Sequence, residues 1–196
     1  MVITSKLATP TTNTKFIGPS WLFIEDGTFV VPFTGTYQIE LHGGGGGGGG
    51  GTYYYNSSYG FDTYVSGGCG GGSGELYTLE LVSNESYTVR IGEGGRAGYD
   101  EASVDSGSAG SKGSTTWFGT YSVDGGEGGT RGYRFGGTDY YGTGGIKSGS
   151  IATDGTNSTP GYGNSNNIEQ SYGNGGARKK DGEPGAVIVT FMGVNT

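Results

Sequence analysis

The chain has 196 residues, the length of a single domain, and it contains 47 glycines and 5 prolines without a collagen-like period of three. Such a composition is typical of disordered chains, but 15 tyrosines, 8 phenylalanines and 2 tryptophans favour an ordered fold, because disordered sequences are poor in aromatic residues. The formal net charge of −7 argues against a nucleic-acid partner, and a single cysteine, Cys69, excludes an intrachain disulfide framework.

The first fifteen residues are polar and contain no apolar core of a signal peptide. No stretch of the chain reaches the length of a membrane span, so we expect no membrane insertion. We interpret residues 1–15 as a lead or attachment segment and residues 16–196 as one domain. Synthesis in a cytoplasm is the corresponding expectation.

Period-two alternation predicts short β-strands in the segments between glycine tracts. The segment from Phe29 to Leu41, with a turn at Thr34-Gly35, is predicted to form one hairpin. A second hairpin is predicted from Glu75 to Ile91, with a turn at Asn84-Glu85. The remaining predicted strands are 16–17, 21–24, 115–118, 121–123 and 186–192.

Eight or nine short strands without any helical period predict an all-β fold, a β-sandwich of jelly-roll type. Only 31% of the residues are hydrophobic, so the apolar core must be small. The core predicted from the alternation comprises Trp21, Phe23, Phe29, Val31, Tyr37, Ile39, Leu41, Leu79, Leu81, Tyr87, Val89, Ile91, Trp117, Val187, Val189 and Phe191.

Nine consecutive glycines, Gly43 to Gly51, follow directly on a predicted strand that ends at His42. The polyproline II conformation has three residues per turn, a rise of about 3.1 Å and no internal hydrogen bonds, so its backbone groups must pair with water or neighbouring segments. Glycine alone lets such segments approach closely. We therefore predict a bundle of polyglycine II helices inserted in the sandwich, built from 43–51, 67–74, 92–98, 107–113, 125–129, 136–149, 155–163 and 173–176.

Five sequence pieces occur in an order that resembles the glycine-rich domain at the tips of bacteriophage tail fibres. They are Tyr37–Gly45, Gly70–Leu76, Tyr87–Gly95, Gly113–Gly119 and Gly182–Phe191, and the resemblance covers about residues 27 to 192. The architecture is also similar to the glycine-rich domain of anaplastic lymphoma kinase-type receptors and to polyglycine bundles of T-even-type phage adhesins. The resemblance implies a virion protein of the tail or fibre, with other tail or fibre proteins as partners and a homotrimer as the assembly.

The segments between the tracts are rich in tyrosine, serine, glycine and asparagine, the residues that dominate antibody paratopes. We interpret them as loops that contact a bacterial surface receptor, either a glycan or an outer-surface protein. The alternative is that these aromatic side chains only cap the lattice or pack between protomers. The candidate receptor-binding residues are Tyr53, Tyr54, Tyr55, Tyr59, Phe61, Tyr64, Tyr133, Phe135, Tyr140 and Tyr141.

Little in the sequence favours catalysis, so we expect neither an enzyme nor a cofactor. His42 is the only histidine, and alternation places it on the polar face of its strand, where we expect it to be exposed. The segment Gly92–Ala97 fits a dinucleotide fingerprint, but no helical pattern follows it. Asp100, Glu101 and Asp105 lack the ligand spacing of a calcium loop and are expected to form a solvated acidic turn rather than a metal site.

Two functions of different classes remain open at this point. The first is a non-enzymatic tail fibre or tip protein of a phage or phage-like particle that binds a receptor through its aromatic loops. The second is a purely structural virion component, such as a fibre, decoration or baseplate protein. An ice-binding polyglycine protein is disfavoured, because such a protein needs a flat Thr/Ala face and this chain carries aromatic loops instead.

Overall fold

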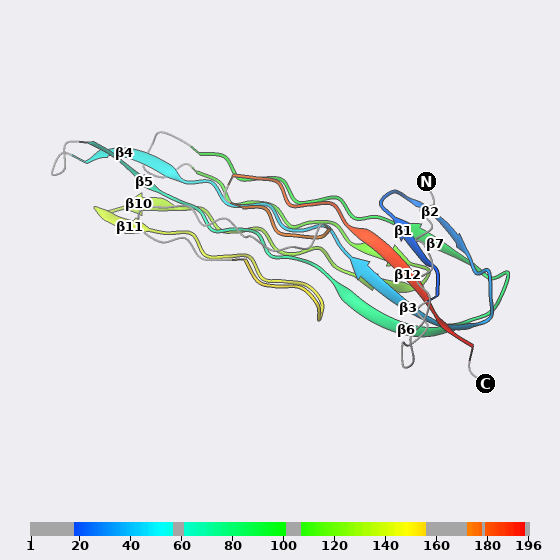
Figure 1. The fold of residues 1–196 in the computed structure, drawn as a ribbon. Coiled ribbons are helices and arrows are strands. Elements are labelled where there is room, and N and C mark those ends of the chain that lie inside the picture. Colours follow the sequence, from blue (N-terminus) through cyan, green and yellow to red (C-terminus); the bar gives the residue numbers. More distant parts are fainter. Residues whose placement is uncertain (1–17, 57–60, 101–106, 156–171, 178, 195–196) are drawn as a thin grey trace.

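The computed structural model describes residues 18–56, 61–100, 107–155, 172–177 and 179–194, with the backbone alone at 53–56 and 61–64. It is all-β, as predicted. Figure 1 shows an elongated molecule with a two-sheet body at one end and a long array of glycine-rich segments extending from it. The described residues form twelve strands, which are β1 (Ser20–Phe23), β2 (Gly27–Val30), β3 (Gly35–His42), β4 (Thr52–Asn56), β5 (Phe61–Val65), β6 (Glu75–Leu81), β7 (Ser86–Arg90), β8 (Thr116–Phe118), β9 (Tyr121–Val123), β10 (Tyr133–Phe135), β11 (Thr138–Tyr140) and β12 (Ala186–Gly193).

The body, which we call the sandwich, consists of two four-stranded antiparallel sheets, with strand orders β1-β12-β3-β6 and β2-β7-β8-β9. Alternate residues of both sheets point into one shared core, which accounts for the period-two pattern of the sequence. The buried core members are Phe29, Val31, Tyr37, Ile39, Leu41, Leu81, Val89, Phe118, Val123, Val187 and Val189. The jelly-roll connectivity stays a prediction.

Two predicted hairpins are wrong. The strands β2 and β3 belong to different sheets, and so do β6 and β7. The segments Val31–Thr34 and Val82–Glu85 therefore connect the two sheets instead of closing a hairpin. Local turn chemistry predicts where the chain reverses, whereas the choice of partner strand depends on long-range pairing such as β3 with β12.

Trp117 is not part of the core, contrary to the prediction, since 41% of it is exposed. Its neighbours Thr116 and Phe118 are fully buried. The Thr116 hydroxyl accepts a hydrogen bond from the buried Gly92 amide at 2.9 Å, which fixes the inward face of β8. Trp117 consequently lies on the outer face, opposite Arg90 of β7.

The tract 43–51 lies inside the glycine array and donates hydrogen bonds to three neighbouring segments in turn, at 2.8 to 2.9 Å. These bonds run from Gly44, Gly47 and Gly50 to Ser114, Ser111 and Ser108; from Gly45 and Gly48 to Glu183 and Lys180; and from Gly46 and Gly49 to Gly71 and Gly68. The residue numbers of the acceptors decrease as the residue numbers along the tract increase, so these three segments run antiparallel to the tract. The three-residue period is that of the polyproline II conformation.

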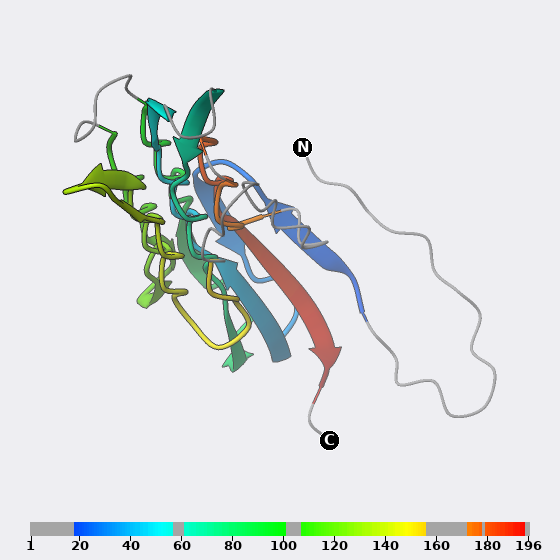
Figure 2. The same ribbon diagram turned by 90° about the vertical axis from the view of Figure 1, so that its left-hand side faces the viewer.

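The carbonyl groups of the same tract accept bonds from three further segments, again with a period of three. The amides of Gly126, Gly129 and Gly132 donate to the carbonyls of Gly44, Gly47 and Gly50, respectively. The amides of Gly95 and Gly98 donate to Gly45 and Gly48, and the amide of Gly176 donates to Gly46. Where two or more bonds define the direction, these segments run parallel to the tract. Within the described residues the tract is thus surrounded by six neighbours, and we call this hydrogen-bonded array the glycine lattice. Figure 2 turns one end of it toward the viewer.

Glycine occupies the lattice positions where a neighbouring segment of the same chain lies against the Cα atom. In the segment 92–99, Gly92, Gly95 and Gly98 are buried, while Glu93, Arg96 and Tyr99 are exposed. A Cβ atom on Gly95 would clash with the Ser111 carbonyl. Glycine is therefore required where backbones make direct contact, and most side chains appear at the outward positions of each turn; Cys69 and Ser73, each 1% exposed, are buried exceptions.

The lattice differs from the predicted tracts at three places. Residues 136–141 belong to the β10–β11 hairpin and its exit, so the predicted tract 136–149 is wrong in its first part. The segment 180–183, which was not predicted, pairs with the central tract. Most of the predicted tract 155–163 lies outside the described residues, as does the segment 1–15.

Candidate functional site at the hairpin end of the lattice

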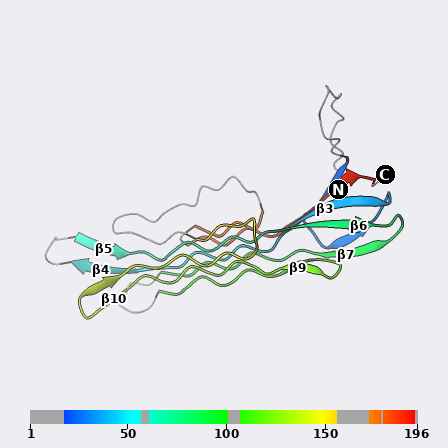
Figure 3. The same cartoon turned by 90° about the horizontal axis from the view of Figure 1, so that it is seen from below.

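Two hairpins close the lattice at the end opposite the sandwich (Figures 1 and 3). They are formed by β4 with β5 and by β10 with β11, each as an antiparallel two-stranded sheet. The prediction of loops at these four segments is wrong, because each of them is a β-strand. The sequence does contain a signal for the second hairpin, because Gly136-Gly137 lies between two short segments with aromatic residues and Gly-Gly is typical of a two-residue hairpin turn. Both glycines have positive φ, 57° and 84°.

The lattice places the two hairpins side by side. The Gly132 amide, just before β10, donates to the Gly50 carbonyl at 3.0 Å, two residues before β4. The Gly142 amide, two residues after β11, donates to the carbonyl of Ser66, the residue immediately after β5, at 3.0 Å. Both hairpins therefore begin and end on neighbouring lattice segments, which fixes their bases relative to each other.

One face of the β10–β11 hairpin carries its aromatic side chains. Tyr133 pairs with Tyr140 across the hairpin, and their rings stack with centroids 4.8 Å apart and planes 7° apart. The Arg131 guanidinium carbon lies 5.2 Å from the centroid of the Tyr133 ring, a cation–π distance. Phe135, two residues beyond Tyr133, is 65% exposed, and Tyr140 is 43% exposed.

The opposite face of this hairpin is polar. Arg134 pairs with Asp139 in the strand register, and its Nη1 atom lies 2.7 Å from the Asp139 Oδ1 atom. Both side chains are about three-quarters buried. A directly opposed, partly buried ion pair stabilises a short hairpin. Arg131, Arg134 and Asp139 are not among the residues predicted from the sequence, although their position around the Gly136-Gly137 turn is a signal for a hairpin.

The ten predicted binding residues fall into three groups. Phe135 and Tyr140 are exposed, whereas Tyr133 and Tyr141 are half-buried. Tyr59 lies outside the described residues. For the remaining five the backbone is placed in β4 or β5, and these are Tyr53, Tyr54, Tyr55, Phe61 and Tyr64.

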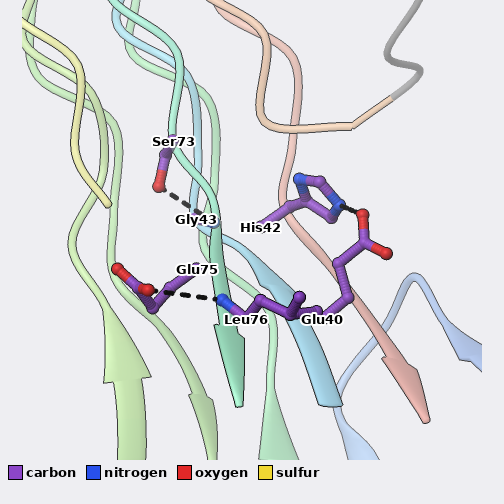
Figure 4. Close-up of polar contacts among 6 residues, drawn as sticks. All are labelled: Glu40, His42, Gly43, Ser73, Glu75 and Leu76. Atoms are coloured by element: carbon purple, nitrogen blue, oxygen red, sulfur yellow. Dashed lines mark hydrogen bonds and ion pairs between the residues drawn. The ribbon is translucent and has the colours of Figure 1, made fainter. Parts of the chain in front are cut away.

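The junction between sandwich and lattice is closed by buried polar groups (Figure 4). The Ser73 hydroxyl accepts a hydrogen bond from the Gly43 amide at 3.1 Å and donates one to the Asp124 carbonyl at 2.5 Å. Ser73 is 1% exposed. One side chain thus joins the first residue of the central tract to the segment that leaves β9.

His42 is 3% exposed, so the prediction that it is exposed is wrong. It does lie on the outer face of β3, but the chain at Tyr172 and Gly173 crosses that face: a Cβ on Gly173 would lie 3.1 Å from the His42 Cβ atom. The His42 Nε2 atom lies 2.6 Å from the Glu40 Oε1 atom. This hydrogen bond lowers the pKa of the Glu40 carboxyl group.

Asp100 is not part of a solvated acidic turn, contrary to the expectation. Its side chain is 9% exposed, its Oδ1 atom accepts the Gly51 amide at 2.7 Å, and its Oδ2 atom lies 2.6 Å from the Lys179 Nζ atom. Asp100 therefore pairs with the last amide of the central tract. Glu101 and Asp105 lie outside the described residues.

Among the described residues, no group of three or more His, Cys, Asp or Glu side chains is arranged to bind a metal ion. The same residues form no helix that is long and apolar enough to cross a membrane. The segment Gly92–Ala97, which fits the dinucleotide fingerprint, belongs to the lattice and opens no helix. The arrangement at the hairpin end offers exposed aromatic ring faces on a fixed base. Such a surface is suited to binding.

The fold and this site define an all-β protein in which a glycine lattice carries two aromatic hairpins away from a two-sheet body. A family model described as a glycine-rich domain matches residues 24–193, and the chain belongs to this family. A search among curated proteins found no matching relative.

Proposed function

We propose that this protein is a tail fibre or tip protein of a phage or phage-like particle that binds a bacterial surface receptor without altering it chemically. The observation that carries the proposal is the pair of hairpins at the far end of the lattice, where Phe135 and Tyr140 are exposed. The resemblance to glycine-rich tips of tail fibres supports the virion context. Location in the virion and synthesis in the host cytoplasm belong to the same proposal.

Rigidity of the lattice supports receptor binding by the hairpins. Gly132 and Gly142 fix the base of β10–β11, and the stack of Tyr133 on Tyr140 orients the second ring before any contact. A surface that is ordered in advance loses less conformational entropy on binding. Exposed ring faces suit both sugars and protein loops, so the receptor is a glycan or an outer-surface protein.

Adsorption of fluorescently labelled protein to cells of candidate hosts tests this proposal. Replacing Phe135 and Tyr140 by serine should abolish adsorption, while the melting temperature of the whole protein changes little because the hairpin lies at the far end of the lattice and neither side chain belongs to the buried core. Trp117→Ser is the matched control, since it removes an exposed aromatic side chain from the sandwich. Joint replacement of Tyr53, Tyr54 and Tyr55 by serine tests the other hairpin in the same assay.

Persistent adsorption after both sets of replacements would contradict the receptor-binding proposal, as would failure of the wild-type protein to bind any host that its particle infects. A purely structural virion component is the alternative, and one observation favours it. Tyr133 is largely engaged within the hairpin by Tyr140 and Arg131, as expected of a capping residue. Retained assembly with no adsorption would support this alternative.

A homotrimer remains our preferred assembly, because three equivalent sites gain avidity when each is weak. Light scattering coupled to size-exclusion chromatography measures the mass directly. A monomer at micromolar concentration contradicts the trimer without affecting the proposal for the hairpins.

A further inference from the structure

The rim of the lattice carries an exposed aromatic side chain, Tyr99, at the same end as the two hairpins. Tyr99 is 61% exposed and is not among the binding residues predicted from the sequence. Gly98, the residue before it, faces the interior, because its amide donates to the Gly48 carbonyl at 2.8 Å and a Cβ atom there would clash with the Ser108 carbonyl. The side chain of Tyr99 therefore occupies an outward position of the lattice.

A series of short contacts connects Tyr99 to the β10–β11 hairpin. The Ser108 amide donates to the Tyr99 carbonyl at 3.0 Å, and the Tyr99 amide donates to the Ser108 hydroxyl at 3.0 Å. One residue earlier, the Gly107 carbonyl accepts a hydrogen bond from Arg131 Nη1 at 3.3 Å. The same guanidinium group lies against the Tyr133 ring of the hairpin. Tyr99 and the aromatic face of the hairpin thus lie on neighbouring segments that are in direct contact.

Hydroxyl groups accompany the exposed rings at this end of the lattice. Phe135 lies directly opposite Thr138 in the strand register, and both residues are exposed. Tyr99 and Tyr140 carry their own phenol groups. In the described segments 98–100, 107–109 and 130–143, Ala109 is the only residue with an aliphatic side chain.

This combination of groups favours a sugar over a protein loop as the ligand. The centre of a protein–protein interface is largely apolar, and its energetically dominant residues include few serines and threonines. A sugar ring presents a C–H face that packs on an aromatic ring and hydroxyl groups at its edge that bond to polar neighbours. Rings beside hydroxyl groups, with almost no aliphatic carbon between them, match the sugar.

We infer that Tyr99 is a further receptor-binding residue and that the receptor is a polysaccharide chain extending from the hairpin onto the lattice rim. This inference rests on the proposed receptor-binding function and names the class of its ligand. Successive sugar rings would pack on Phe135, Tyr140 and Tyr99. A ligand that contacts both the hairpin and Tyr99 has to cross the segment at Gly107 and Ser108, so it is longer than one sugar unit.

Two treatments of host cells test the class of receptor. Periodate cleaves carbon–carbon bonds between neighbouring hydroxyl groups of sugars, whereas a protease removes exposed protein loops. Adsorption of the labelled full-length protein should be lost after periodate treatment and retained after protease treatment. Polysaccharide extracted from the same cells should compete for adsorption, and its mono- and disaccharide fragments should compete at least roughly tenfold less well because they cannot span the surface.

Variants of Tyr99 test its place in the site. Tyr99→Ser should reduce adsorption about tenfold, whereas Tyr99→Phe, which keeps the ring face, should reduce it much less. Trp117→Ser removes an exposed aromatic ring from the sandwich, and Ile146→Ser changes an exposed lattice position, so both serve as matched controls with unchanged adsorption. All four variants should melt close to the wild-type temperature, since each changed side chain is exposed.

Three results would overturn this inference and leave the proposed function intact. The first is adsorption that protease abolishes and periodate spares, which identifies a protein receptor. The second is equal competition by short fragments and intact polysaccharide. The third is full adsorption of Tyr99→Ser where the joint replacement of Phe135 and Tyr140 has lost it, which confines the contact to the hairpin. Absence of wild-type adsorption would instead overturn the proposed function and this inference together.

Discussion

The sandwich and the glycine lattice solve the same problem with opposite arrangements of side chains. In the sandwich, large side chains such as Tyr37 and Ile39 fill the interior and the backbone pairs within two sheets. In the lattice the backbone itself fills most of the interior, and most side chains occur at outward positions. Order therefore does not require an apolar core where every interior backbone group finds a hydrogen-bond partner.

The glycine lattice depends on the sandwich for its stability, because its hydrogen bonds barely offset the entropy cost of ordering glycine. Ordering the backbone of one residue costs about 1 to 2 kcal/mol, and glycine has the most freedom to lose. One hydrogen bond within the protein makes a net contribution of about 0.5 to 1.5 kcal/mol to the free energy of unfolding. These terms roughly cancel for each glycine, so a lattice segment gains little by itself. Attachment of a lattice segment to the sandwich, such as the hydrogen bond of Gly43 to Ser73 at one end of the central tract, reduces the conformational entropy that the segment loses on ordering.

The lattice rim has its own way of pairing outward amide groups. Side-chain oxygens of neighbouring segments accept them at 2.6 to 3.0 Å: Ser111 from Arg96, Ser108 from Tyr99, Asp181 from Ala97, Asp154 from Lys147, Thr130 from Thr143 and Asp100 from Gly51. Short residues with an acceptor oxygen suit this role. The rim thus accounts for part of the serine and aspartate content of the chain.

The largest expected effect comes from adding one methyl group inside the lattice. A Cβ on Gly71 would clash with the Ile146 carbonyl, whereas a Cβ on Gly72 meets the Thr153 carbonyl oxygen at 3.3 Å. Gly71→Ala should destabilise the protein by roughly 3 kcal/mol or more, because backbone atoms must move. Gly72→Ala, its neighbour, should cost about 1 kcal/mol or less.

Thermal and urea unfolding of both alanine variants measure this difference, and Gly46→Ala should behave like Gly71→Ala because its Cβ would clash with the Glu127 carbonyl. Equal stability of Gly71→Ala, Gly72→Ala and the wild-type protein would contradict a close-packed lattice.

An intermediate effect is expected at the junction. Ser73→Ala leaves the buried Gly43 amide without its acceptor and the Asp124 carbonyl without its donor. The free energy of unfolding should fall by about 1 to 3 kcal/mol. Hydrogen exchange should then speed up in 43–51 before it does in the sandwich strands. Ser114→Ala, at an exposed lattice position, is the control and should change stability by less than about 0.5 kcal/mol.

The smallest effect is expected in the sandwich core. Ile39→Val removes one methylene group from a fully buried side chain and should cost about 0.5 to 1.5 kcal/mol in urea unfolding. The sandwich thus tolerates the loss of a carbon atom better than the lattice tolerates the gain of one. If Ile39→Val destabilises more than Gly71→Ala, the contrast between the two regions is wrong.

The fold class, most of the core and most of the lattice segments can be predicted from the residue pattern alone. Alternation identified Tyr37, Ile39 and Leu41 because side-chain burial in a strand repeats every two residues. The glycine runs identified the lattice because close approach of several backbones excludes any Cβ atom. Both signals are local, and they are readable without knowledge of the partner segment.

Strand pairing, the buried face of β8 and the burial of His42 depend instead on contacts between segments that are distant in the sequence. Thr116 faces inward because it accepts the Gly92 amide, and His42 is buried because residues 172 and 173 cross its face. Each outcome depends on a contact between residues far apart in the chain. Residue type and local period carry no information about such contacts, since loop closure and pairing are properties of the whole fold.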